Sequence, residues 1–326
     1  MISIRQQGES TVTGLILRVI AAEPVADRIR WLRLARPDGA ELPAFTAGAH
    51  VEVTLPDGQT RPYSLIDFDA TSAAPDTYHL GVLLETESRG GSMHMHALSL
   101  GDTVTLAAPK TDFPLHDGPE PALLIAGGIG VTPMISMATA LKAQGRPYRL
   151  VYAGRSAASM AFADRLAAQH GAALTLHHDD AAGGPLDLRA LIGSAAPGTQ
   201  VYVCGPRPMI EAAREIATAA GLPVHFESFD AVTPQEGDTA FEVEVASTGA
   251  VFTIPPGRTI VEVLEEAGMD LMHDCLRGDC GICQTEVLAG VPDHRDVVLT
   301  DAERAEGKLI HICVSRAKSP RLTLDL

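Results

Sequence analysis

The sequence predicts a multidomain protein of mixed α/β and β class, with an antiparallel β-barrel, a parallel α/β sheet and a small C-terminal module. Its 326 residues are too many for one ordinary core, so two or three domains are expected. From about residue 12 to 115 the pattern alternates like β structure, and beyond residue 121 strand and helix patterns take turns. Residues 238–326 contain 16 acidic and 8 basic residues, so this end carries half of the net charge of −16.

The first part of the chain is rich in strand patterns. Residues 50–55 and 60–65 flank the turn sequence Pro56-Asp57-Gly58, which predicts a β-hairpin. Residues 78–85 and 102–109 show the same kind of pattern, and few long helical patterns intervene. A small antiparallel barrel is the simplest architecture for these strands.

The second part alternates between apolar strand patterns and amphipathic helix patterns. The expected strands cover residues 122–126, 148–154, 173–178 and 200–204, and the expected helices cover 135–145, 161–171 and 209–221. This alternation predicts βαβ units and a parallel sheet. Residues 229–239, FDAVTPQEGDT, have the composition of a linker. A hairpin at 241–257 and a helix at 259–269 are expected to begin the last module.

Composition and charge exclude several classes of function. Hydrophobic residues make up 46% and charged residues 20%, which is typical of a globular protein. The net charge of −16 argues against nucleic acid and anionic membranes as partners. Glycines and a proline interrupt the long uncharged run at 121–141, which therefore predicts a strand, turn and helix and no membrane span. The N-terminus lacks a signal-peptide core, and five cysteines is an odd count, so a reducing cytoplasmic location is expected.

Four of the cysteines have the spacing of iron–sulfur ligands. Cys275, Cys280 and Cys283 follow the pattern C-x4-C-x2-C, and 29 residues separate Cys283 from Cys313. This is the plant-type spacing for a [2Fe–2S] cluster, which two irons form with four thiolates. Zinc usually takes two short cysteine knuckles, a redox dithiol would leave Cys275 and Cys313 unexplained, and a Rieske centre would need paired histidines. The spacing favours the [2Fe–2S] cluster over all three.

Two stretches in the barrel region could hold a phosphate and a flat ring. In Arg61-Pro62-Tyr63-Ser64-Leu65, the arginine could face a phosphate while tyrosine and serine contact a ring. An edge strand with a tolerated proline explains the same stretch equally well. Ser88-Arg89-Gly90-Gly91-Ser92 precedes an expected helix, whose exposed amides would suit an anion. Many loops share this second pattern, but two such sites in one domain support each other.

A glycine turn follows the first strand of the α/β region. In Gly127-Gly128-Ile129-Gly130-Val131-Thr132-Pro133, we expect Thr132 to be the N-cap and Pro133 the first helical residue. The pattern G-x-G-x-x-G is not matched, so the standard Rossmann fingerprint is absent. A glycine turn before a helix still suits a pyrophosphate, although a tight turn without ligand is the commoner case. Cys204-Gly205-Pro206 ends a later strand, where α/β sheets place their ligands.

These motifs occur together in the order found in one family. RPYSL, SRGGS, GGIGVTPM, YVCGP, HFESF, the four cysteines and the ending SRAKSPRLTLDL span almost the whole chain. The chain thus resembles the flavin–iron–sulfur reductases of Rieske-type oxygenases, especially the phthalate dioxygenase reductase family with its vanillate O-demethylase reductase subunits. The resemblance implies an FMN-binding β-barrel over residues 1–115, a ferredoxin reductase-like NAD(H)-binding domain over 116–230 and a β-grasp [2Fe–2S] ferredoxin domain over 238–326.

The resemblance also implies roles for individual residues. Those that would bind the FMN phosphate are Arg61, Arg89, Gly90, Gly91 and Ser92, and those that would line the flavin ring are Tyr63, Ser64 and Leu65. Those that would hold the nicotinamide nucleotide are Gly128, Gly130, Thr132, Cys204, Gly205 and Pro206. Arg155 would lie near the adenosine ribose, where an arginine could meet a 2′-phosphate, so NADPH stays possible although NADH is favoured. Phe229, or else Phe226, would shield the flavin until nicotinamide displaces it, and Ser64 and Cys204 would set the geometry of hydride transfer.

The function implied is electron transfer from NADH through FMN and the [2Fe–2S] cluster to a partner oxygenase. The acidic ferredoxin domain would dock on a basic patch of that partner, whose own substrate would be an aromatic acid or ether. One alternative is a self-contained NAD(P)H diaphorase that reduces a quinone, ferric chelate or cytochrome. Alternatives of another class are an iron–sulfur redox sensor and a zinc-stabilised binding module.

Overall fold

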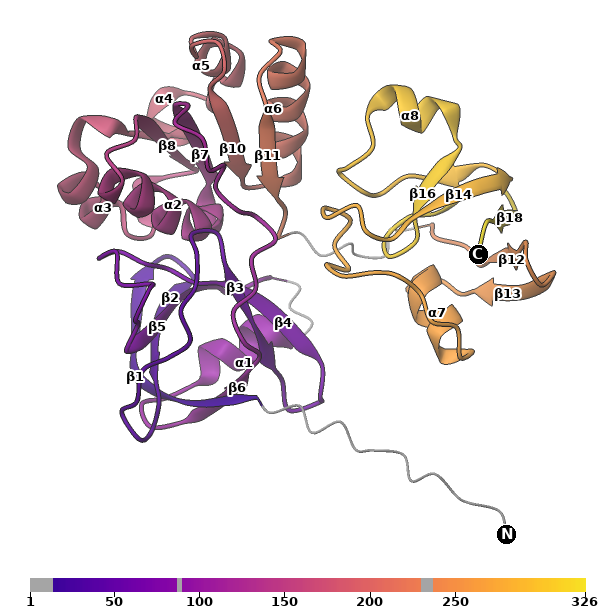
Figure 1. Cartoon of the computed structure of the whole chain (residues 1–326), viewed down its shortest axis with the longest axis horizontal. Helices are drawn as coiled ribbons and strands as arrows, with labels where there is room; N and C mark the ends of the chain where they lie inside the picture. The colour runs from indigo at the N-terminus through magenta and orange to yellow at the C-terminus, as the bar shows by residue number, and fades with distance from the viewer. Residues whose placement is uncertain (1–13, 87–89, 230–236) are drawn as a thin grey trace. The chain divides into compact units, whose positions relative to one another are not determined.

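The computed structural model describes residues 14–86, 90–229 and 237–326 (Figure 1). The chain forms two compact units. One comprises Met1–Asp187 with Ser194–Tyr202, and the other comprises Leu188–Gly193 with Val203–Leu326.

The first unit begins with a six-stranded antiparallel sheet. Its strands are β1 (Leu15–Ala26), β2 (Ile29–Ala35), β3 (His50–Thr54), β4 (Thr60–Ser64), β5 (Thr77–Leu83) and β6 (Thr103–Leu106), in the order β4-β3-β6-β1-β2-β5. An isolated bridge between Leu65 and Leu80 joins the two edges and closes the sheet into the expected barrel. Alternate strand residues such as Leu17, Leu32 and Leu80 fill its core. The short helix α1 (Gly91–Ala97) follows β5.

The second sheet is the expected parallel one. Its strands are β7 (Ala122–Gly127), β8 (Tyr148–Gly154), β9 (Leu174–His178), β10 (Gln200–Cys204) and β11 (Val224–Glu227), in the order β11-β10-β7-β8-β9. The helices of this region are α2 (Val131–Ala143), α3 (Ala163–His170), α4 (Asp179–Ala182), α5 (Leu188–Gly193) and α6 (Arg207–Ala219). Every residue of β7 is buried, as a strand in the middle of a covered parallel sheet requires.

The start of α2 differs from the expectation. A 3₁₀ turn covers Gly128–Gly130, and α2 then begins at Val131, with Gly130 as its N-cap. The prediction that Thr132 caps the helix is wrong, because the 3₁₀ turn carries the chain into the helix two residues earlier. The Thr132 hydroxyl lies inside the first turn and donates to the carbonyl of Ile129 at 3.0 Å. Gly128 has a φ of +55°, which favours glycine at the start of this turn.

The third sheet, in the second unit, is mixed. Its strands are β12 (Phe241–Val245), β13 (Ala250–Ile254), β14 (Gln284–Ala289), β16 (Leu309–His311) and β18 (Arg321–Leu324), in the order β13-β12-β18-β14-β16. The first strand, β12, pairs in parallel with the last, β18, as in a β-grasp fold. Helix α7 (Ile260–Glu266) follows the β12–β13 hairpin and starts on a capping box formed by Thr259 and Glu262. Helix α8 (Asp301–Glu306) and the pair β15 (Pro292–Asp293) and β17 (Arg316–Ala317) complete the module.

No helix within residues 14–86, 90–229 and 237–326 combines the length and the apolar character that crossing a bilayer requires.

Candidate functional site

The four cysteines predicted as ligands belong to one module. Cys275, Cys280 and Cys283 lie on the loop between α7 and β14, and Cys313 comes two residues after β16. Cys283 and Cys313 are buried among the core residues of this module, and their Sγ atoms are 3.0 Å apart. Cys275 and Cys280 are half-buried, and all five cysteines of the chain are free thiols.

The thiols are close enough to change one another's ionisation. The hydrogen bond with Cys313 lowers the pKa of Cys283 to about 7. Contacts with Cys280 and Cys313 lower the pKa of Cys275, and the amide of Arg277 donates to its Sγ at 3.3 Å. The same contacts raise the pKa values of the partner thiols Cys280 and Cys313, so each contact favours the thiolate on one sulfur and the thiol on the other.

The arrangement of the thiols suits two irons better than one ion. Within the described ranges, no three His, Cys, Asp or Glu side chains converge as the ligands of a single ion do. The four thiols instead form a chain of contacts, in which Cys280 meets Cys275, Cys275 meets Cys313 and Cys313 meets Cys283. A [2Fe–2S] cluster needs two thiolates on each iron, so the donor set fits this group.

Glycines allow the cysteine loop to fold tightly. Gly278 and Gly281 have φ values of +77° and +78°, which other residues rarely adopt. A Cβ atom on Gly278 would lie 2.6 Å from the side chain of Val314 and 3.0 Å from the Cα of Asp296. Both glycines therefore allow the backbone to curl close to the cysteine side chains.

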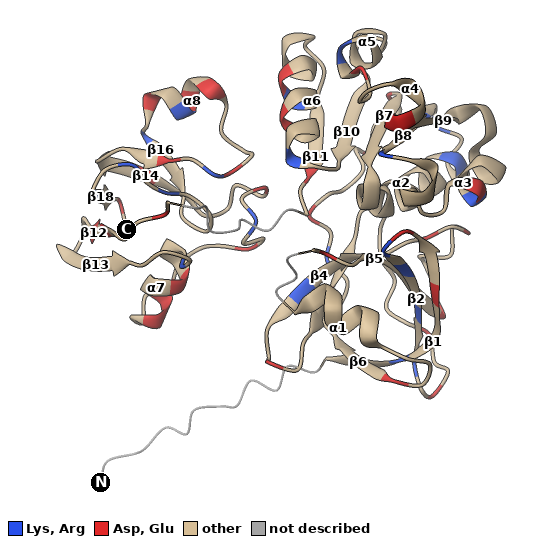
Figure 2. Ribbon diagram, turned by 180° about the vertical axis from the view of Figure 1, so that it is seen from behind, with Lys and Arg blue, Asp and Glu red and all other residues tan. Residues whose placement is uncertain are grey.

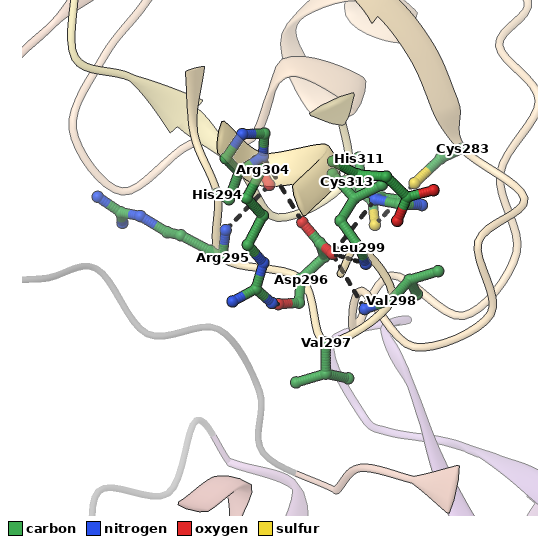
Figure 3. A network of polar contacts seen from close by, with 12 residues as sticks. Cys283, His294, Arg295, Asp296, Val297, Val298, Leu299, Arg304, His311 and Cys313 are labelled. Carbon is green, nitrogen blue, oxygen red and sulfur yellow. Dashed lines mark hydrogen bonds and ion pairs between the residues drawn. The ribbon is translucent and has the colours of Figure 1, made fainter. Parts of the chain in front are cut away.

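Sequence reasoning missed a buried polar pair beside this loop (Figure 3). The Oδ2 atom of Asp296 accepts hydrogen bonds from the amides of Val298 and Leu299 at 3.0 and 2.8 Å. It also lies 3.5 Å from Nδ1 of His311, and both side chains are fully buried. Burial opposes ionisation of Asp296, but the contacts with His311 and the Leu299 amide prevail and hold its pKa well below the usual range.

The position of this pair links two ligand segments. Val297 donates its amide to the carbonyl of Gly278 in the cysteine loop, and His311 precedes Cys313 by two residues. The sequence carries only two signals of this pair. Asp296 stands beside the apolar residues of RDVVL, and His311 stands among the apolar residues of LIHICV. Neither indicated that the two residues meet.

The two phosphate motifs predicted in the barrel lie together. Strand β4 lies at the edge of its sheet. On the open side of this strand no neighbouring strand requires a hydrogen bond from the backbone nitrogen of Pro62, which has no hydrogen to donate. A Cβ atom on Gly91 would lie 2.8 Å from Cγ of Arg61 and 3.4 Å from the hydroxyl of Tyr63. The first residues of α1 therefore contact the predicted ring-binding strand. Arg89 lies outside the described residues.

The strand predicted to bind the flavin ring contains a buried hydroxyl. Ser64 is buried, and its Oγ has no hydrogen-bond partner within the described part of the protein. Burial raises the pKa of Tyr63 to about 12, so its hydroxyl stays neutral at physiological pH. Leu65 is fully buried in the barrel core, and its amide donates to the carbonyl of Ala49. A flavin ring edge carries donors and acceptors that would satisfy Ser64, so the residues fit this group.

The predicted nucleotide turn and Arg155 lie at the same edge of the parallel sheet. β7 and β8 run in parallel with Gly127 opposite Ala153, so the chain leaves both strands side by side. Arg155 is exposed there, whereas Thr132 is buried and its hydroxyl is already used by Ile129. A bound nucleotide would therefore meet the backbone of the turn rather than the Thr132 side chain.

The remaining predicted residues lie in the second unit. Cys204 is fully buried at the end of β10, and Gly205 and Pro206 form the turn into α6. The ring of Phe226 packs under the guanidinium of Arg214, 4.5 Å from its centre. Phe229 is half-buried and lies two residues beyond β11. The roles predicted for these residues remain predictions.

Two protein-family models match parts of the chain. Residues 243–318 match the 2Fe-2S iron-sulfur cluster binding domain. Residues 110–225 match the N-terminal domain of proteins like the dimethylamine monooxygenase subunit DmmA.

Whole-chain comparisons give relatives of similar length. The chain is 40% identical to vanillate O-demethylase oxidoreductase of a Pseudomonas species, over 94% of this chain and 98% of that protein. It is 39% identical to tetrachlorobenzoquinone reductase of Sphingobium chlorophenolicum, over 97% and 99%. The solved structure of phthalate dioxygenase reductase, described as a modular structure for electron transfer from pyridine nucleotides to [2Fe–2S], is 38% identical, with a TM-score of 0.74 over 96% of this chain and 98% of that one.

Proposed function

Because the chain belongs to the phthalate dioxygenase reductase family, we propose that it carries electrons from NADH through FMN and a [2Fe–2S] cluster to a Rieske-type oxygenase. The observation that carries this proposal is the convergence of four thiols, joined by mutual contacts, in a module that follows a barrel and a parallel α/β sheet. FMN supplies the ability to accept two electrons as a hydride and to release them one at a time.

The chain's own residues bind and orient the groups. Cys275, Cys280, Cys283 and Cys313 hold the two irons. Arg61 and the first turn of α1 bind the FMN phosphate, because a guanidinium and helix amides both favour an anion. Tyr63 and Ser64 contact the ring, and the unpartnered Ser64 hydroxyl forms a hydrogen bond with it. Leu65 supports the ring from the barrel core.

The nicotinamide nucleotide is held by the turn at Gly128, Gly130 and Thr132, together with the Cys204–Pro206 turn. Phe229 covers the flavin until nicotinamide displaces it, and the packing of Phe226 under Arg214 supports this choice between the two rings. Arg155 lies beside the adenosine ribose; NADH is preferred, and NADPH would place its 2′-phosphate there. We propose the domain bounds that the family resemblance implies. The FMN domain covers residues 1–115, the NAD(H) domain covers 116–230 and the ferredoxin domain covers 238–326.

The ferredoxin module presents a surface suited to a partner protein. Acidic residues line α7 and α8 (Figure 2). Around the cysteines, the side chains of Met272, Leu276 and Ile282 are 78, 49 and 44% exposed. We propose that these apolar side chains contact the oxygenase while the acidic residues meet a basic patch on it. The free thiols are consistent with a reducing cytoplasmic location.

One preparation tests the proposal. The purified protein should show the visible spectrum of a flavin and an iron–sulfur cluster, release FMN on denaturation, and contain two irons and two sulfides per chain. NADH should bleach the flavin. A colourless protein with one zinc would refute the proposal, and release of FAD would refute the assignment of FMN.

A second candidate function is direct reduction of a quinone. The relative named tetrachlorobenzoquinone reductase favours this alternative. A self-contained reductase would give full activity with its physiological acceptor in the absence of a partner protein. Steady-state turnover with quinones, compared with turnover in the presence of a Rieske oxygenase, distinguishes the two functions.

A further inference from the structure

A single buried hydroxyl joins the barrel to helix α2 in the first unit. Ser136 lies on α2 and is 2% exposed. Its Oγ donates to the carbonyl of Leu65 at 2.8 Å and accepts from the amide of Asp67 at 2.8 Å. Both hydrogen-bonding roles of the hydroxyl are therefore used, and both partners are backbone groups just beyond β4.

The two segments that Ser136 joins are those assigned to the flavin ring and to the nicotinamide nucleotide. Leu65 directly follows Ser64 on the proposed flavin strand. Helix α2 begins at Val131, directly after the Gly128–Gly130 turn assigned to the nicotinamide nucleotide. A shift of α2 along its axis would break both hydrogen bonds and leave two buried backbone groups without partners, which is costly.

A second contact sets how closely the same segments approach. A Cβ atom on Gly81 of β5 would lie 2.9 Å from Cγ2 of Thr132, and 3.4 Å from side-chain atoms of Ile66 and Phe162. The φ of Gly81 is not in the left-handed region, so an alanine is compatible with the backbone there. The glycine is therefore required for close packing between β5 and the nucleotide turn, and not for backbone conformation.

We propose that Ser136 is a positioning residue for hydride transfer, which holds the nicotinamide turn in register with the flavin strand, while Gly81 sets their spacing. This inference rests on the function proposed above. Hydride transfer requires the reacting atoms to lie within about 3.5 Å of each other, and a misplacement of about 1 Å can cost roughly 100-fold in rate. The buried Ser136 hydroxyl donates one hydrogen bond of 2.8 Å and accepts another of 2.8 Å, which suits it to hold the two segments at a fixed distance.

The test compares Ser136→Ala with Thr139→Val in the full-length holoprotein. Thr139 lies one turn further along α2, is also buried, and its hydroxyl has no hydrogen-bond partner among the described residues. Stopped-flow reduction of the flavin by NADH should be roughly 10- to 100-fold slower in Ser136→Ala and unchanged in Thr139→Val. The long-wavelength absorbance of the stacked nicotinamide and flavin rings should fall in Ser136→Ala, while its flavin content stays at the wild-type level.

Other outcomes are decisive in different ways. A wild-type rate and wild-type long-wavelength absorbance in Ser136→Ala would overturn the positioning role. If Ser136→Ala does not fold, Gly81→Ala takes its place, because it removes no hydrogen bond; it should slow flavin reduction, and a wild-type rate would overturn the inference. A wild-type protein that contains no FMN or is not reduced by NADH would instead refute the proposed function.

Discussion

Nδ1 of His311 lies 3.5 Å from the carboxylate of Asp296, and neither side chain has any contact with solvent. The same carboxylate accepts two backbone amides, from Val298 and Leu299. The backbone of Asp296 packs against Gly278 in the cysteine loop, so this buried pair connects the loop to the strand that precedes Cys313.

Replacing Asp296 with asparagine should destabilise the ferredoxin module by roughly 1–3 kcal/mol, because a neutral amide replaces the buried carboxylate that accepts hydrogen bonds from two backbone amides. The loss should appear as a lower denaturant midpoint of unfolding. The visible absorbance of the cluster measures that midpoint. Glu306→Gln on the exposed surface of α8 is the control and should leave the midpoint unchanged. Equal midpoints for the two variants would contradict the role of the pair.

Replacing Cys283 with serine should abolish electron transfer to the partner and leave NADH reduction of the flavin intact. The reason is that Cys283 contributes one of four thiolates, while the flavin site is built from another part of the chain. Iron and sulfide assays should fall well below the wild-type content. The fifth cysteine is the control: Cys204→Ala should keep full iron and sulfide. Loss of flavin reduction in a folded Cys283→Ser protein would show that the proposed domain division is wrong.

Replacing Arg61 with glutamine should weaken FMN binding by roughly 10- to 100-fold, since a charge-assisted hydrogen bond contributes about 1.5–3 kcal/mol. Riboflavin lacks the phosphate, so its affinity should not change. Fluorescence titration of the flavin-free protein with both flavins measures this difference. Arg36→Gln, which removes an exposed arginine paired with Asp38, should bind both flavins normally. Equal losses for FMN and riboflavin would place Arg61 away from the phosphate.

Stability should fall in alkali between pH 10 and about pH 12. Burial raises the pKa of Tyr63 and of Tyr78 to about 12, from an ordinary value of 10. The folded protein therefore holds these protons to a higher pH than the unfolded chain does. Their contribution is complete below pH 10 and is lost as pH rises through the folded-state values. Tyrosinate absorbance and far-ultraviolet circular dichroism should change together, and ionisation without unfolding near pH 10 would contradict the burial of these rings.

Most of the fold was predictable because its signals are local. The alternation in β4 and β5, the strand–turn–helix pattern at β7 and α2, and the Thr259–Glu262 capping box each depend on residues near one another in the chain. The start of α2 was predicted wrongly, because the choice between a 3₁₀ turn and an N-cap at Thr132 depends on what that side chain packs against. In the structure it faces Gly81 of the barrel.

The sequence by itself predicted the ligand set, since four cysteines at this spacing form the plant-type pattern of a [2Fe–2S] cluster. It also determined the order in which the sheets follow one another along the chain. The reason is that the periodicity of apolar residues, which distinguishes strands from helices, depends on residues that are adjacent in the sequence. Only the tertiary structure decided which distant groups meet. Ser136 reaches Leu65 from 71 positions away, and Asp296 meets His311 across a buried core. No local pattern encodes such contacts, because they exist only once separate elements pack and exclude water.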